Sequence, residues 1–115
     1  MIKVKAFQVS PSEIEGVLLL HPDIIDAAVI GVPAQRQSDG EEPRAYITLS
    51  PGSKLSEAAI RNHLVERLAR YKQCTGGIVI GAEIPKSMSG KKLKRLLVER
   101  ASQELAANQR AEAKL

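Results

Sequence analysis

Cysteine and aromatic residues are scarce in this chain of 115 residues, and each shortage excludes a class of structure. The single cysteine, Cys74, excludes an intrachain disulfide and any zinc site built from several cysteines. Phe7, Tyr46 and Tyr71 are the only Phe, Tyr or Trp residues, so Val, Ile, Leu and Ala must supply the core. We therefore expect a reduced, structural thiol and an aliphatic core.

Long apolar runs and strong net charge are also lacking. No apolar stretch approaches the ~20 residues that a membrane-spanning helix needs, and the N-terminus lacks a signal-peptide pattern. The formal charge of +4 permits an anionic partner without demanding one. These features predict no membrane span and an intracellular, reducing environment for a chain long enough for one domain.

The hydrophobic periodicity and the turn residues predict alternating helices and strands. The expected elements are a strand or hairpin arm over 2–9, a helix over 11–20, strands over 24–32 and 45–49, a helix over 56–71, a strand over 77–80 and a helix from about residue 90. The polar loop 33–43 would join two antiparallel strands. This order predicts an α+β domain over 1–102, with a small three-stranded sheet, packed helices and an N-terminal hairpin arm. Residues 103–115 are expected to form a flexible tail.

Several side chains carry more specific expectations. Phe7 and Leu20 are expected to point into the core, while Glu13 should complete a capping box with Ser10. Glu15 is interpreted as a surface charge, and Arg44 as half of a surface ion pair. Structural roles are expected for the two histidines, which are His21 and His63, because no carboxylate cluster accompanies them, and no metal site is expected.

The most basic stretch of the chain is "IPKSMSGKKLKR", residues 84–95, and no acidic residue occurs between Lys86 and Val98. Its serines and Gly90 predict a pliable turn, with Ser89 capping a helix whose first turn holds Lys91. A lysine there is unfavourable by roughly 0.3–1 kcal/mol, because a helix N-terminus is itself partly positive. Two interpretations remain open: a solvated basic face, or a lysine carried on a mobile loop toward a phosphate held elsewhere.

A nucleotide site, if this lysine serves one, must lie mostly on another domain. The chain lacks a glycine-rich phosphate cradle of the G-x-x-x-x-G-K-[ST] kind. Binding of nucleic acid is disfavoured, because no aromatic residue is interleaved with the basic cluster and the net charge is small.

Three separated motifs resemble one known family. They are "IKVKAFQVSPSEIEGVLLLHPDIIDAAVIGVP", "GEEPRAYITL" and "IPKSMSGKKLKR", in the order and spacing found in the C-terminal domain of adenylate-forming enzymes. The resemblance covers residues 2 to about 100. The P-K-S-x-S-G-K ending is similar to that of the acyl-CoA synthetase, 4-coumarate–CoA ligase and firefly-luciferase group, whereas adenylation domains of peptide synthetases usually end in N-G-K.

The resemblance implies one half of a two-domain enzyme, an acid–CoA ligase. Such ligases make an acyl-adenylate from ATP and a carboxylic acid, release pyrophosphate and transfer the acyl group to CoA. A large N-terminal adenylation domain binds ATP, magnesium and the acid, and the small C-terminal domain rotates between two poses. In the first pose the lysine after S-G enters the site. Lys91 stands at that position, as the catalytic residue of adenylation.

The second pose serves thioester formation. The resemblance implies that Lys3 and Gln8 contact the adenylate, or its AMP moiety, and that Lys5, Ala6 and Phe7 line the pantetheine route. Ala6 departs from the family pattern, which has glycine there. An added methyl group at a narrow tunnel would weaken CoA transfer, so the thioester step is less firmly implied than adenylation.

The start of the chain also departs from the family, because Met1 stands where a hinge is expected. We therefore expect an excised C-terminal domain that is inactive alone. Two alternatives stay open: a free-standing interaction module descended from this domain, and part of a luciferase-like oxidase. The acid substrate cannot be read from this chain, because its pocket belongs to the N-terminal domain.

The chain ends in Ala113, Lys114 and Leu115, which resemble the peroxisomal S-K-L signal with alanine in place of serine. The expected location is therefore peroxisomal if the signal is read, and cytoplasmic otherwise.

Overall fold

The computed structural model describes residues 2–4, 7–34 and 40–113, with side chains described as far as residue 107. The elements in chain order are β1 (Ile2–Val4), β2 (Phe7–Val9), α1 (Pro11–Leu19), β3 (Ile24–Pro33), β4 (Glu41–Leu49), α2 (Glu57–Arg67), a short 3-10 helix (Arg70–Lys72), β5 (Ile78–Ile80) and α3 (Lys94–Ala113). The predicted α+β class is confirmed.

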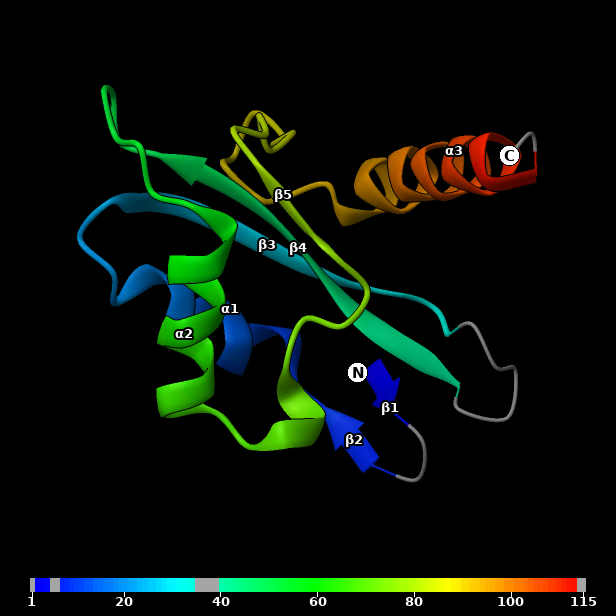
Figure 1. The fold of residues 1–115 in the computed structure, drawn as a ribbon. Helices are drawn as coiled ribbons and strands as arrows, with labels where there is room; N and C mark the ends of the chain where they lie inside the picture. The colour runs from blue at the N-terminus through cyan, green and yellow to red at the C-terminus, as the bar shows by residue number, and fades with distance from the viewer. Residues whose placement is uncertain (1, 5–6, 35–39, 114–115) are drawn as a thin grey trace.

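Two separate sheets organise the domain. β1 and β2 form an antiparallel hairpin, and β3, β4 and β5 form a sheet in that spatial order, antiparallel between β3 and β4 and parallel between β4 and β5. Helices α1 and α2 lie on one face of the larger sheet and α3 on the other (Figure 1). The three-stranded sheet, the packed helices and the hairpin arm were all predicted from the sequence.

Alternation along β4 divides the core into two clusters. Ala45 and Ile47 pack with α1, α2 and the hairpin, whereas Tyr46 packs on the opposite face with Leu97 and Ala101 of α3. Helices cover both faces, so the middle of β3 is buried at every position from Ala27 to Ile30. This double burial explains the continuous apolar run in the sequence.

The helix caps agree only in part with those predicted from the sequence. Ser56 caps α2 as expected, because its side chain accepts a hydrogen bond from the Ala59 N–H at 3.1 Å. Ser10 precedes α1, which begins at Pro11, but its side chain makes no capping hydrogen bond. The expected capping box is wrong, and Glu13 instead pairs with Lys72 at 2.9 Å.

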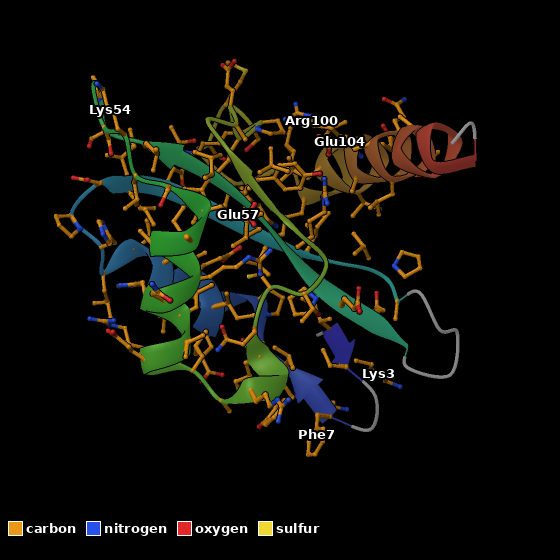
Figure 2. All side chains as sticks on the ribbon, viewed as in Figure 1. Lys3, Phe7, Lys54, Glu57, Arg100 and Glu104 are labelled. Carbon is orange, nitrogen blue, oxygen red and sulfur yellow. The ribbon has the colours of Figure 1, made fainter. Side chains whose placement is uncertain are left out.

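Some predicted boundaries and burials are wrong. β4 begins at Glu41 rather than residue 45, because Glu41 and Glu42 pair with Pro33 and Val32 of β3. Phe7 is 51% exposed and Leu20 is 68% exposed, so neither lies in the core. Phe7 is on the same face of the hairpin as Val4 and Val9, because it is opposite Val4 in the register, but it lies at the outer end of the hairpin (Figure 2), beyond the core.

Arg44 is buried, not on the surface. Its guanidinium donates to the Gly76 carbonyl at 2.9 Å and to Glu104 of α3 at 3.2 Å. The Tyr46 hydroxyl donates to the same Glu104 carboxylate at 2.6 Å, and burial, followed by this hydrogen bond, raises the pKa of Tyr46. These contacts fasten α3 to β4 beyond residue 102, where the tail was expected to begin.

Candidate functional site

Residues 86–92 form a tight hairpin between β5 and α3. Lys86 and Lys92 pair as an isolated antiparallel bridge, and the Ser87 N–H donates to the Lys91 carbonyl at 2.8 Å. The Gly90 N–H donates to the Ser87 carbonyl at 2.9 Å, and Gly90 has a φ of 84°. A three-residue hairpin loop with glycine in the left-handed region is a standard tight connection.

The serines strengthen this turn. The Ser87 hydroxyl accepts the Lys91 N–H at 3.2 Å and lies 2.9 Å from the Ser89 hydroxyl. The expected pliable approach to Lys91 is therefore a closed, hydrogen-bonded turn. The expected helix start is also wrong: α3 begins at Lys94, so neither Ser89 nor Lys91 belongs to its first turn.

Most lysines of the basic stretch are held by acids on other elements. Lys86 pairs with Asp26 at 2.6 Å, and Lys92 lies 3.7 Å from the other oxygen of the same carboxylate. Lys94 pairs with Glu15 of α1 at 2.7 Å. Among the residues that the structure describes, none pairs with the exposed Lys91 ammonium. Three of the four lysines in this stretch are therefore held in ion pairs with described residues, and Lys91 is not.

These contacts lie along the outer edge of β3. Glu15 accepts the Val29 N–H at 2.8 Å, and the Lys92 ammonium donates to the Ala27 carbonyl. Side chains thus occupy the backbone groups that an edge strand leaves unpaired. The interpretation of Glu15 as a surface charge is wrong, since it is buried against this edge.

The second group of predicted site residues lies on the β1–β2 hairpin. Lys3 and Gln8 stand opposite each other in the strand register, and both are exposed. The Lys3 N–H donates to the Glu41 carboxylate at 3.3 Å, which connects the hairpin with β4. Lys5 and Ala6 lie outside the described residues.

Phe7 is placed by an aromatic contact that sequence analysis missed. Its ring stacks on Tyr71 with centroids 4.4 Å apart and an interplanar angle of 22°. Both rings border a groove of about 450 Å³ that is also lined by Val4, Glu41, Glu42, Arg70 and Thr75. Figure 2 shows Phe7 at the outer end of the hairpin, with Lys3 on the neighbouring strand.

The two groups of predicted site residues lie far apart. The hairpin arm is at one end of the domain, and the segment between β5 and α3, which contains Lys91, is at the other (Figure 1). The segment that carries Lys91 and the strand that carries Lys3 therefore belong to separate parts of the domain surface.

The histidines make local contacts. His63 Nε2 lies 2.6 Å from the Val17 carbonyl, and His21 Nδ1 accepts the Asp23 N–H at 3.1 Å. Within the described ranges, no group of three His, Cys, Asp or Glu residues is placed to hold a metal ion, and no helix is long and apolar enough to cross a membrane.

Comparison with known proteins identifies the family. The sequence model of the family described as "AMP-binding enzyme C-terminal domain" matches residues 13–91, more than half of the chain. The chain belongs to this family. The match includes the hairpin as far as Lys91, so the resemblance seen in the sequence motifs is confirmed.

Relatives of this AMP-binding enzyme C-terminal domain are much longer proteins. Acyl-CoA synthetase ACTT5 of Alternaria alternata is 50% identical over 109 residues, which cover 94% of this chain and 19% of that protein. The Mycobacterium tuberculosis fatty acyl CoA synthetase superposes with a TM-score of 0.81 at 34% identity, over 90% of this chain and 20% of that one. The anthranilate CoA ligase AuaEII, in complex with anthranoyl-AMP, gives a TM-score of 0.80 at 38% identity, over 92% and 20% of the two chains. This domain spans about a fifth of each relative.

The C-terminal residues complete the inventory of predicted sites. Ala113 is the last residue of α3, and Lys114 and Leu115 lie outside the described residues. The peroxisomal signal therefore stays a prediction.

Proposed function

We propose that this domain is the mobile C-terminal part of an ATP-dependent acid–CoA ligase, and that Lys91 supplies the positive charge for adenylation. One observation carries the proposal. Of the four lysines between Lys86 and Lys94, Lys91 alone has no partner among the described residues, although it stands on a closed turn. An exposed ammonium held on such a turn is suited to entering a site on another domain.

The chemistry of adenylation explains why a lysine is needed. A carboxylate oxygen attacks the α-phosphorus of ATP, and the bond to pyrophosphate breaks. Negative charge grows on the phosphate oxygens during this step, and a cation nearby in a site shielded from water lowers the barrier. In this proposal the N-terminal adenylation domain binds ATP, magnesium and the carboxylic acid, and Lys91 adds its charge at the reacting phosphate.

The β1–β2 hairpin would serve the second half-reaction, in which CoA sulfur attacks the acyl carbonyl and AMP leaves. Lys3 and Gln8 are side by side on its exposed face and would contact the adenylate. Phe7, held by Tyr71, would line the pantetheine route together with Lys5 and Ala6. The separation of this hairpin from Lys91 is what supports a rotation between two poses (Figure 1).

The test compares variants of the full two-domain enzyme that contains this chain. In Lys91→Ala, pyrophosphate release should fall by roughly 100-fold or more, because one preorganised charge is lost at the reacting centre. Thioester formation from a pre-made acyl-adenylate should stay within a few-fold of wild type. Lys54→Ala is the matched control, since Lys54 is an exposed lysine in the segment between β4 and α2 (Figure 2).

Equal loss in both half-reactions would contradict the two-pose assignment, and unchanged adenylation would contradict the role of Lys91. In the second case the basic stretch is a solvated face, and Lys91 has no part in adenylation. Oxidation of the adenylate with light emission, in place of thioester formation, would favour the luciferase-like alternative.

A further inference from the structure

Asp26 occupies an unusual place on β3. The register between β3 and β4 is interrupted between Ile24 and Asp26, which leaves Ile25 as a bulged residue, 57% exposed. A bulge bends a strand and re-aims the side chain that follows it. The Asp26 carboxylate lies at this bulge, beside the hairpin that carries Lys91.

The Asp26 carboxylate contacts a lysine on each of the two strands of that hairpin. Asp26 Oδ2 pairs with Lys86 at 2.6 Å on the strand that enters the turn, and Oδ1 lies 3.7 Å from Lys92 on the strand that leaves it. Lys92 also donates to the Ala27 carbonyl, and the Ala27 N–H donates to Asp26 Oδ1 at 3.0 Å. The two strands are therefore tied to β3 as well as to each other.

The Asp26 carboxylate, which holds both strands of the hairpin, is largely shielded from solvent. The Asp26 side chain is only 20% exposed, and the next residue, Ala27, is fully buried in the core. Burial alone would raise the pKa of Asp26, but the hydrogen bonds from Lys86 and the Ala27 N–H, with the charges of Lys86 and Lys92, lower it below its ordinary value. The carboxylate is therefore ionised at neutral pH.

We propose that Asp26 is a positioning residue that clamps the 86–92 hairpin to the edge of β3 and so sets the direction of the Lys91 ammonium. Asp26 does not touch substrate in this proposal, and it acts only through Lys91. The inference rests on the proposed role of Lys91 in adenylation. Its physical basis is that a rigid strand, rather than the loop itself, determines where the cation points.

The experiment uses the full two-domain enzyme and substitutes Asp26→Asn, which keeps the shape and removes the charge. The kcat of pyrophosphate release should fall roughly 10- to 100-fold, the range expected when a catalytic group is displaced by about 1 Å. The KM for ATP and thioester formation from pre-made adenylate should stay within about twofold. Asp26→Glu, which restores the charge, should recover much of the loss.

Asp23→Asn is the matched control. Asp23 is a partly buried carboxylate three residues earlier, and it accepts a hydrogen bond from Ser53 rather than from the hairpin. It should leave adenylation unchanged. If Asp26→Asn fails to fold, Lys92→Met opens the same clamp from its other end and should give the same selective loss.

A double-mutant comparison distinguishes the positioning role of Asp26 from the proposed role of Lys91 in adenylation, on which it rests. In a Lys91→Ala background, Asp26→Asn should cause no further loss of adenylation, because both act through one ammonium. A full additional loss would overturn the positioning role. If Lys91→Ala itself has no effect, the proposed function fails; if only Asp26→Asn has none, the clamp alone is wrong.

Discussion

Cys74 shows at the residue scale how burial controls chemistry. Its side chain is fully buried in the cluster between the sheet and helices α1 and α2. Burial raises the pKa of the thiol to about 12, although the charge of Arg61 partly opposes this. A thiol that stays protonated is a poor nucleophile, so the structural role expected from the sequence is supported by its surroundings.

Folded protein should therefore react slowly with a thiol reagent at pH 8, and denaturant should make the reaction fast. The unfolded thiol ionises near its ordinary pKa, whereas the folded thiol stays protonated until pH about 12. The unfolded state thus loses its proton first, so the free energy of unfolding should fall as pH rises from about 9 toward 12. Urea titrations across this range measure the slope.

Cys74→Ala is the control, because lysine and tyrosine residues also titrate in this range. The difference in slope between the two proteins isolates the thiol. Identical slopes, or rapid labelling of the folded chain, would show that Cys74 is less shielded than its position indicates.

At the scale of elements, the 86–92 hairpin is the part that sequence reasoning described least well. Its serines, glycine and lysines predicted a pliable turn leading into a helix. The residues instead form a closed turn between Lys86 and Lys92, which pair as an antiparallel bridge before α3 begins. The missed signal was Asp26, an acid inside an otherwise apolar strand. Spacing along the chain could not reveal that Lys86 and Lys92 lie against it.

Gly90→Ala tests the importance of this turn. Alanine at a φ of 84° costs about 1–2 kcal/mol of backbone strain, although the space around Gly90 is open. In the full enzyme we expect a matching loss of stability in a urea titration and a fall of about tenfold in pyrophosphate release, because the turn that holds Lys91 relaxes.

Gly52→Ala provides the comparison, since Gly52 has a φ of 81° and equally open surroundings in a turn after β4. It should lose similar stability while adenylation stays normal. Equal effects of the two substitutions on adenylation would mean that the shape of the 86–92 hairpin has no special role.

At the scale of the whole molecule, the domain has the compactness of an independent folding unit. Its radius of gyration is 14.1 Å, against about 13 Å expected for a compact domain of this length. Both faces of its sheet are covered, and α3 is fastened by Glu104 to Arg44 and Tyr46. The hairpin arm and the segment that carries Lys91 nevertheless lie at opposite ends (Figure 1), and Lys91 does not line the groove beside Phe7.

We therefore expect the isolated chain to fold cooperatively and to release no pyrophosphate from ATP and a carboxylic acid. Circular dichroism would follow folding, and a coupled pyrophosphate assay would follow turnover. The same chain joined to its N-terminal adenylation domain must be active in that assay as a positive control. Turnover by the purified chain alone would show that the domain holds a complete active site.

The sequence by itself determined the α+β class, the three-stranded sheet and the family. Local signals suffice for these, because periodicity, turn residues and motif spacing are properties of neighbours along the chain. Only the tertiary structure decided which lysines of the basic stretch form ion pairs. Asp26 and Lys86 are 60 residues apart, as are Arg44 and Glu104, and Phe7 and Tyr71 are 64 apart. Such pairs form only after the strands assemble, so no local pattern could separate Lys91 from its neighbours.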